Sequence, residues 1–281
     1  MAVHIIEQSI IPKQAGSCLC EDGLFVNENF IAVIDGVTSK GVLPWPESPA
    51  PGGESMTSGR YAKEVLLKAL STLPPAIDGA GAMDYLNEAL ARACGARRSI
   101  LMEKPEERLQ AVIILYSLHH REVWAFGDCQ CLINGRHYHH GKALDSLLSE
   151  VRSLYIQTEL LLGRSEASLS GHDTGREYIL PLLRRQLLFA NEESVYGYDV
   201  LNGFPIQPEH VIIYPVPPRS RLVLASDGYP VLKETLAESE AALRDLIEKD
   251  PLCFRENKGT KGLVKGNDSF DDRTYICFDA L

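Results

Sequence analysis

The chain has 281 residues, of which 45% are hydrophobic and 23% are charged. This is the composition of an ordinary folded protein, so it excludes a disordered chain, a coiled coil and a collagen-like repeat. With 28 Lys and Arg against 38 Asp and Glu, the net charge is −10, and such a surface repels the phosphates of nucleic acids and anionic membranes. We therefore expect neither nucleic acid nor membrane as a partner.

The cysteines and the start of the chain predict a cytoplasmic location. Seven cysteines, an odd number spread along the sequence, indicate reduced thiols rather than a disulfide framework. Residues 1–16 lack the basic flank and long apolar core of a signal peptide. No stretch approaches the roughly 18 apolar residues of a membrane span.

Six short runs rich in β-branched and aromatic residues, bounded by turn residues, are predicted to be strands. In chain order they are Phe30–Ile34, Ala111–Leu118, Val123–Phe126, Val211–Val216, Arg221–Ala225 and Thr274–Phe278. The stretch 117–122 and the pair Asn134-Gly135 have the composition of hairpin turns, which predicts that the sheet is at least partly antiparallel.

Helical periodicity places apolar residues on one stripe in each of five segments between these runs. The segments are 62–73, 83–93, 144–154, a helix that Asp173 caps and that runs past Leu182 and Leu187, and 243–247. Strands that come in hairpins, with helices in separate pairs, predict an α+β class in which helices pack on sheets.

Two segments have the composition of loops. The stretch 41–53 contains four prolines and cannot form regular structure, and the stretch 255–267 interleaves glycines with lysines. The simplest interpretation of each is a solvated surface loop.

Aspartates stand at the ends of several predicted strands. They are Asp35 and Asp227, each followed by glycine, Asp128, and the pair Asp271-Asp272, which opens the last strand. A single Asp-Gly is most simply a turn. If the strand ends converge, however, carboxylates about 4 Å apart repel by roughly 1 to 4 kcal/mol per pair, so the cluster needs cations. Ligand sets made only of oxygen favour Mg²⁺ or Mn²⁺ over zinc.

Five motifs follow one another in a recognisable order. They are Glu21-Asp22, the strand that ends in Asp35-Gly36, Gly127-Asp128, Leu224-Ala225-Ser226-Asp227-Gly228, and Asp271-Asp272-Arg273-Thr274. Their order and spacing resemble the metal-dependent protein phosphatases of type 2C. The resemblance covers nearly the whole chain, from Glu21 to Phe278.

The resemblance implies a four-layer α-β-β-α sandwich, in which two antiparallel sheets pack face to face and helix pairs flank them. It implies one phosphatase-like domain over residues 1–281. Two segments stand out from it: a proline-rich insertion at 41–53, expected to overhang the cleft and narrow substrate choice, and a helical, flap-like segment at 141–191.

A centre of two Mg²⁺ or Mn²⁺ ions is also implied. Carried over residue by residue, Asp35 would bridge the ions, and Asp227 and Asp271 would complete the first ion's ligands. Glu21 and the carbonyl of Gly36 would hold the second ion. Asp35, Asp227 and Asp271 are therefore the expected catalytic residues, acting through a metal-activated water.

Three further acids have supporting places in this scheme. The resemblance gives Asp128, together with Asp227, the role of holding a weaker third ion. Asp22 and Asp272 are expected behind the ligands. Four carboxylates, those of Glu21, Asp35, Asp227 and Asp271, would balance the charge of two divalent cations.

The chain departs from the family where the family binds phosphate. The arginine that often grips the phosphate is Ser17 here, Gln130 replaces the arginine of Gly-Asp-Ser-Arg, and Val37 replaces a histidine that is a candidate general acid. Lys13 and Lys40 are the candidate substitutes for phosphate binding, as point charges without the bidentate fork of arginine.

The leading prediction is a Mg²⁺- or Mn²⁺-dependent phosphatase. Its substrate would be a phosphorylated protein, at phosphoserine or phosphothreonine, or another small phosphomonoester. The alternative is a catalytically weak or inactive pseudophosphatase, which keeps the sandwich as a binding or regulatory module. The lost arginine and histidine favour an altered substrate or slow chemistry. A third interpretation, an unrelated α+β protein with chance Asp-Gly turns, predicts that the acids are scattered in space.

Overall fold

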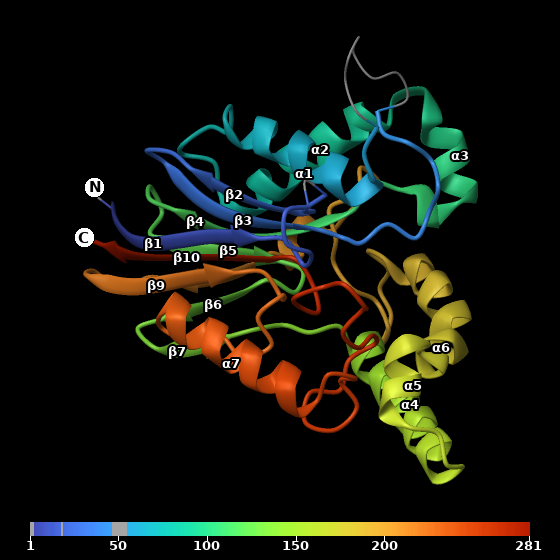
Figure 1. Cartoon of the computed structure of the whole chain (residues 1–281). Coiled ribbons are helices and arrows are strands. Elements are labelled where there is room, and N and C mark those ends of the chain that lie inside the picture. The colour runs from blue at the N-terminus through green and yellow to red at the C-terminus, as the bar shows by residue number, and fades with distance from the viewer. Residues whose placement is uncertain (1–2, 18, 47–54) are drawn as a thin grey trace.

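The computed structural model of the chain describes residues 3–17, 19–46 and 55–281. Ten strands form two five-stranded sheets, in which every neighbouring pair is antiparallel (Figure 1). Sheet A contains, in spatial order, β1 (Val3–Ile11), β10 (Arg273–Ala280), β9 (Ser220–Ala225), β6 (Gln130–Ile133) and β7 (Arg136–Tyr138). Sheet B contains β2 (Asp22–Val26), β3 (Phe30–Gly36), β4 (Ala111–Ser117), β5 (Glu122–Phe126) and β8 (Ile212–Pro215).

Strand β3 shows how the two sheets come to share a core. Side chains of a strand alternate between its faces, so Ile31 and Val33 point one way and Ala32 and Ile34 the other. The first pair belongs to a buried cluster with Leu224 and other residues of sheet A, which fills the space between the sheets. The second pair belongs to a cluster that lies under the helices. Buried on both faces, β3 reads as a continuous apolar run.

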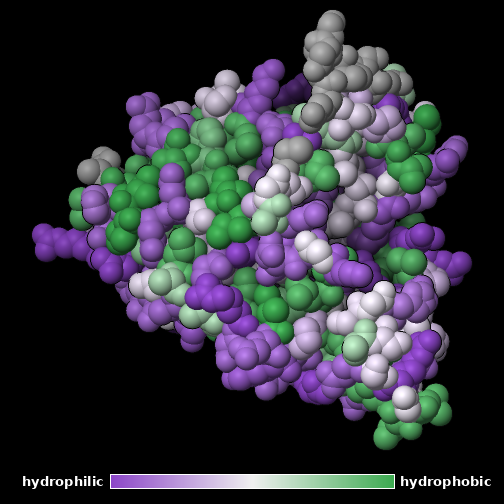
Figure 2. All heavy atoms as spheres, in the orientation of Figure 1, coloured by the Kyte–Doolittle hydropathy of each residue, from purple (hydrophilic) through white to green (hydrophobic). Residues whose placement is uncertain are grey.

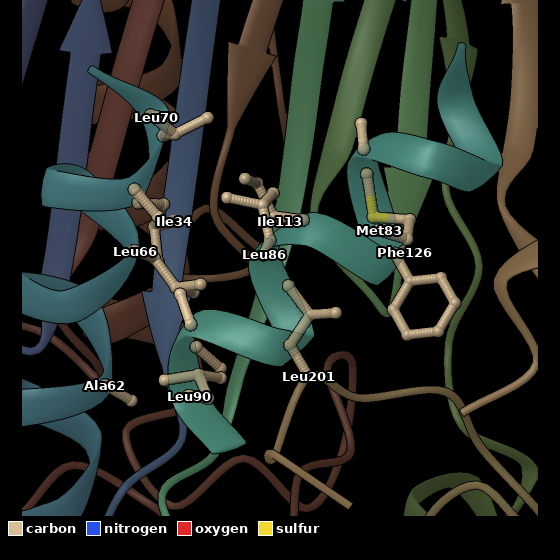
Figure 3. Packing of buried hydrophobic residues seen from close by; sticks show 14 of the residues in the cluster. Ile34, Ala62, Leu66, Leu70, Met83, Leu86, Leu90, Ile113, Phe126 and Leu201 are labelled. Atoms are coloured by element: carbon tan, nitrogen blue, oxygen red, sulfur yellow. The ribbon is translucent and has the colours of Figure 1, made fainter. Parts of the chain in front are cut away.

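Helices α1 (Ser58–Leu70) and α2 (Gly79–Cys94) cover the outer face of sheet B. Thr57 and Asp78 cap them, each accepting a hydrogen bond from a backbone N–H of the first turn. Figure 3 shows the packing, in which one stripe of each helix faces the strands. The residues in contact are Ala62, Leu66 and Leu70 of α1, Met83, Leu86 and Leu90 of α2, and Ile34, Ile113 and Phe126 of the sheet.

The helices from residue 143 onward lie on the other side of the molecule (Figure 1). Helix α7 (Leu236–Lys249) packs on sheet A, while α4 (Ala143–Leu161), α5 (Glu166–Gly171) and α6 (Thr174–Arg185) extend beyond the end of the sandwich (Figure 1). The short α3 (Arg98–Glu103) follows α2. Figure 2 shows a hydrophobic tip where α4 ends, at which Leu161 and Leu162 are 88% and 81% exposed.

The predicted α+β class and the two antiparallel sheets are confirmed. All six predicted strands form, and the five predicted helical segments correspond to α1, α2, α4, α6 and α7, although α1 ends before Leu73 and α6 before Leu187. Asp173 caps α6 as predicted, since its Oδ1 accepts a hydrogen bond from the N–H of Arg176 at 2.8 Å. Among the helices that the structure describes, none is both long enough and apolar enough to cross a bilayer.

The proline-rich segment lies against the helices, as far as it is described. Trp45 is 1% exposed, stacks on Tyr61 of α1 with 5.7 Å between ring centroids, and lies under the guanidinium of Arg97. Residues 41–46 contribute no side chain to the cavity described below. Residues 47–54 lie outside the described part of the chain, so the prediction that this loop overhangs the cleft stays a prediction there.

Candidate active site

The strand ends that carry the aspartates meet at one end of the sandwich. In sheet A, Ala225 pairs with both Tyr275 and Gln130. Asp227, Asp271 and Asp128 therefore lie next to three adjacent antiparallel strands, at the same end of the sheet. In sheet B, Asp35 stands opposite Asp22. Because the two sheets are stacked, these two ends lie next to each other. The acids are therefore not scattered turns, and the third interpretation of the sequence is wrong.

A cavity of about 460 Å³ lies at this end of the sandwich. Five acids and five basic residues line it. The acids are Asp35, Asp128, Asp145, Asp227 and Asp271, and the bases are Lys13, Lys40, Lys142, Arg176 and Lys261. A neighbouring cavity of about 340 Å³ shares Asp128, Asp227 and Asp271 with it. A negatively charged protein thus keeps an evenly balanced set of charges inside its main cavity.

Asp35 and Asp227 carry the strongest electrostatic conflict in the cavity. Burial, and then the charges of Asp227, Asp22 and Asp128, raise the pKa of Asp35 well above its ordinary value. Burial, Asp128 and Asp271 raise the pKa of Asp227 to about 6, although solvent reaches this carboxyl through the cavity and a hydrogen bond from Asp35 opposes the rise. Two facing carboxyl groups of this kind need either a shared proton or a cation.

Asp271 is in the opposite state, because two lysines neutralise it. The Nζ atom of Lys13 lies 3.0 Å from its Oδ1, and Lys261 pairs with its Oδ2. Burial raises the pKa of Asp271, but the two ammonium groups outweigh burial and leave it lowered. Asp271 is therefore ionised at neutral pH.

Lys13 is held by three carboxylates at once. Besides Asp271, its Nζ lies 3.5 Å from Oδ2 of Asp272 and 3.7 Å from Oε2 of Glu21. A lysine so surrounded has its charge already compensated. The contacts therefore do not support the prediction that Lys13 binds the substrate phosphate.

Asp128 is paired in the same way with Lys142, which precedes α4. Their Nζ and Oδ2 atoms are 2.8 Å apart. Burial lowers the pKa of Lys142, but Asp128 and Asp145 outweigh it, so the pKa is raised and the lysine stays charged. The pair ties the sandwich to the helical segment that follows β7.

Asp22 and Asp272 lie behind the cavity, at 3% and 4% exposure. The hydroxyl of Ser226 donates to Oδ2 of Asp22 at 2.6 Å, and the N–H of Glu21 donates to Oδ2 of Asp272 at 2.9 Å. Each acid thus connects a strand of sheet B to a strand of sheet A. Their place fits the prediction that they position other groups.

The second predicted ion site contains an open space between two oxygens. A Cβ added to Gly59 would stand 2.9 Å from both Oε1 of Glu21 and the carbonyl oxygen of Gly36. The hydroxyl of Thr57 donates to the same Oε1 at 2.7 Å, which fixes the carboxylate. Because residue 59 has no side chain, both oxygens, and the carbonyl oxygen of Val37 at 2.5 Å, face the small space that its Cβ would fill.

The donor chemistry of the site fits hard divalent cations. Only oxygen donors face the two spaces, and the Asp35–Asp227 pair gains from a positive charge. In the described part of the chain, however, no three His, Cys, Asp or Glu residues are grouped so that they could hold a metal ion. The carboxylates share the cavity, and lysines stand among them.

Three residues of the cavity were missed by the sequence analysis. Lys142, Asp145 and Arg176 all come from the helical segment after β7, where no motif marks them. Lys261 belongs to the glycine- and lysine-rich stretch that the sequence does reveal as a loop. Gln130, which stands where the family has arginine, donates from Nε2 to the carbonyls of Ser226 and Tyr229 at 3.0 and 2.7 Å, so it holds the turn after β9.

No protein-family model and no curated protein matches the chain. It is similar to solved structures that include RsbX in complex with magnesium, with 10% identity, a TM-score of 0.44 and 99% of both chains covered. Another is the catalytic domain of the serine/threonine protein phosphatase PstP with two manganese ions, with 16% identity, a TM-score of 0.45 and 99% of both chains covered.

A third is the PPM Ser-Thr phosphatase MsPP from Mycobacterium smegmatis in complex with cacodylate, with 15% identity, a TM-score of 0.43 and 98% of both chains covered. At such identities, the likeness does not say which side chains act in this protein. Over nearly its whole length, the chain resembles solved serine/threonine phosphatases, as its motif order predicts.

Proposed function

We propose that the protein is a phosphatase that depends on Mg²⁺ or Mn²⁺. It would hydrolyse phosphoserine or phosphothreonine in a protein, or another phosphomonoester. The single observation that carries the proposal is the facing pair of Asp35 and Asp227 in a cavity that also contains basic side chains. The paired carboxylates require a cation, and the basic side chains beside them require an anion. A metal ion and a phosphate ester, bound together, would meet both requirements.

The proposed ligands follow from the places of these oxygens. Asp35 would bridge two ions, Asp227 and Asp271 would complete one, and Glu21 with the carbonyl of Gly36 would hold the other. Asp128 would contribute to a weaker third. Bound cations would supply positive charge for the phosphoryl oxygens and lower the pKa of a water molecule, which is the nucleophile.

The chain's own contacts prepare this arrangement. The hydroxyl of Thr57 orients Glu21. The hydroxyl of Ser226 holds Asp22, which pairs with Asp35 between strands β2 and β3. A site positioned by strands and buried hydrogen bonds loses little entropy when a ligand binds. The six cysteines of the described residues are all free, which supports the proposal of a reducing, cytoplasmic location.

The contacts of Lys13 favour a second candidate function, a pseudophosphatase. Its ammonium group lies among Glu21, Asp271 and Asp272, and so supplies positive charge where the first proposal calls for a metal ion. If this lysine keeps its place, the chain would hold phosphorylated partners without hydrolysing them rapidly.

Hydrolysis of p-nitrophenyl phosphate tests the two functions against each other. The wild type is assayed with Mn²⁺ and with EDTA, beside Asp227→Asn and the matched control Asp245→Asn, which changes an exposed acid of α7. Activity that needs Mn²⁺, disappears in Asp227→Asn and remains in Asp245→Asn supports the phosphatase.

The negative outcomes differ from one another. No hydrolysis, with Mn²⁺ binding still seen by calorimetry, supports the pseudophosphatase. If the protein shows no hydrolysis and also binds no Mn²⁺, the metal-dependent function is contradicted altogether. Circular dichroism of each variant shows whether the fold is intact.

A further inference from the structure

Two cations of the main cavity differ from the others in having no carboxylate partner. Lys40 follows β3, and Arg176 belongs to the first turn of α6, so two separate elements bring these cations to the same cavity. Neither forms an ion pair with any residue that the structure describes. By contrast, Lys13 and Lys261 pair with Asp271, and Lys142 pairs with Asp128.

Arg176 lines the main cavity, and one hydrogen bond holds its guanidinium. Its Nη1 donates to the carbonyl oxygen of Thr260 at 2.8 Å, which anchors one edge of the group. The neighbouring Arg152 shows the alternative: it is fully buried, pairs with Asp173 and donates to three backbone carbonyls. Arg152 is thus a structural arginine, whereas Arg176 is half-buried and lines the cavity.

Positive charges crowd around Lys40. Burial and the charges of Lys142, Arg176 and Lys261 lower its pKa to about 8, against the opposing charge of Asp145. Burial also lowers the pKa of Arg176. Unpaired cations in a partly buried space are costly, and a dianion removes that cost.

We propose that Lys40 and Arg176 form an anion pocket that binds the phosphate group of phosphomonoesters and inorganic phosphate. Arginine offers two parallel N–H donors to two phosphate oxygens, and lysine adds a compact charge. The helical segment 141–191 thereby supplies the bidentate group that Ser17 and Gln130 do not. Anion binding stands on these contacts alone, while a role for it in catalysis rests on the proposed phosphatase function.

The pocket also explains how one cavity holds both kinds of charge. Its acidic part, around Asp35 and Asp227, requires positive charge, and its basic part, around Lys40 and Arg176, requires negative charge. A cation and a phosphate group bound side by side satisfy both requirements. Each then lowers the cost of binding the other.

Binding of inorganic phosphate tests the pocket without any reaction. Calorimetric titrations are made in EDTA and again with Mn²⁺, for the wild type, Lys40→Ala, Arg176→Ala and Arg176→Lys. The matched controls are Arg184→Ala, an exposed arginine of the same helix, and Lys68→Ala, an exposed lysine of α1. We expect each alanine variant of the pocket to bind phosphate at least tenfold more weakly, because it loses a charged hydrogen-bond donor.

Arg176→Lys keeps the positive charge but loses the two parallel N–H donors. Its phosphate affinity is therefore expected to lie between those of the wild type and Arg176→Ala. Weaker phosphate binding by the pocket variants, with unchanged affinity in the two control variants, supports the pocket. Arg176→Lys keeps the test valid if an alanine variant does not fold. Phosphate affinity that is equal in the wild type and in both alanine variants overturns the proposal. So does a wild type that binds phosphate in neither condition.

The test separates this proposal from the phosphatase function. Phosphate affinity that depends on Lys40 and Arg176, in a protein without hydrolysis, supports the pocket and contradicts the enzyme. Mn²⁺-dependent hydrolysis with phosphate affinity unaffected by both variants supports the enzyme and overturns the pocket. If both hold, Arg176→Ala should raise KM for p-nitrophenyl phosphate more than it lowers kcat.

Discussion

Lys13 and Asp271 are 258 positions apart in the sequence, yet the Nζ of one lies 3.0 Å from Oδ1 of the other. The backbone N–H of Lys13 also donates to Oδ1 of Asp272 at 2.8 Å. The turn after the first strand is thereby tied to the start of the last strand. Together with Lys261, Lys13 keeps Asp271 ionised, and it places a fixed cation among the proposed metal ligands.

The first prediction concerns competition between this lysine and a metal ion. Lys13→Met keeps the aliphatic stem and removes the charge, so Glu21 loses its counter-ion and Asp271 keeps only that of Lys261. We expect Mn²⁺ to bind more tightly, by about three- to tenfold, because like charges near the ligands repel a divalent cation. Calorimetry measures the change, with the exposed Lys68→Met as control. Weaker binding in Lys13→Met would show that Lys13 positions Asp271 rather than competing with the metal.

The second prediction concerns the contact between the sheets behind the cavity. The hydroxyl of Ser226 donates to Asp22 at 2.6 Å and accepts from the N–H of Thr274 at 2.9 Å, and all three residues are buried. Ser226→Ala leaves two buried polar groups without a partner, so we expect a loss of about 1–3 kcal/mol in the free energy of unfolding.

Urea denaturation measures the effect of Ser226→Ala. Ser170→Ala, at an exposed position of α5, is the matched control and should stay within about 0.5 kcal/mol of the wild type. Equal stability of the two variants would mean that water replaces the hydroxyl.

The third prediction concerns the space beside Gly59. In a helix, Gly→Ala ordinarily stabilises by roughly 0.5–1 kcal/mol. Here the added Cβ would come within 2.5 Å of the carbonyl oxygen of Val37 and 2.9 Å of Oε1 of Glu21, so the backbone must shift. We expect Gly59→Ala to destabilise the fold and to weaken Mn²⁺ binding.

Thermal unfolding and calorimetry follow the Gly59→Ala variant. Gly171→Ala is the control, because a Cβ there meets no atom within 4 Å. A Gly59→Ala protein with unchanged Mn²⁺ affinity would exclude Glu21 and the carbonyl of Gly36 as ligands.

The fourth prediction is a pH dependence of anion binding. The pKa of Lys40 is lowered from 10.5 to about 8, so the ammonium group loses its proton as the pH rises through 8. Burial is the main cause of this lowered pKa, and Lys142, Asp145, Arg176 and Lys261 are the charged groups that also affect it. Because a phosphomonoester has its second pKa near 6, the ligand's charge is constant in this range.

Affinity for p-nitrophenyl phosphate in EDTA should therefore fall between about pH 8 and pH 10, since the bound anion shifts the lysine pKa upward. Lys40→Arg stays charged throughout and should remove this fall while it keeps the affinity at pH 7. A Lys40→Arg protein with the same pH profile as the wild type would assign the titration to another group.

Some of the fold follows directly from local sequence, and some does not. The run Phe30–Ile34 is apolar at every position and ends in Asp35-Gly36, so a buried strand and its end can be predicted without the tertiary structure. Strand β1 shows the opposite case. Its pairing with β10 shifts register between Ile5 and Glu7, so its isoleucines do not alternate and the strand signal is lost.

The sequence by itself determined the element types and the order of the acidic motifs, because helix and strand periods and Asp-Gly strand ends are local properties. The tertiary structure decided which cations reach those acids. Lys13 lies in the turn after β1, Lys142 just before α4 and Arg176 in α6, and no local pattern connects them with Asp271, Asp128 or each other. These contacts depend on how the sheets stack and where α4 and α6 pack, which only the folded chain specifies.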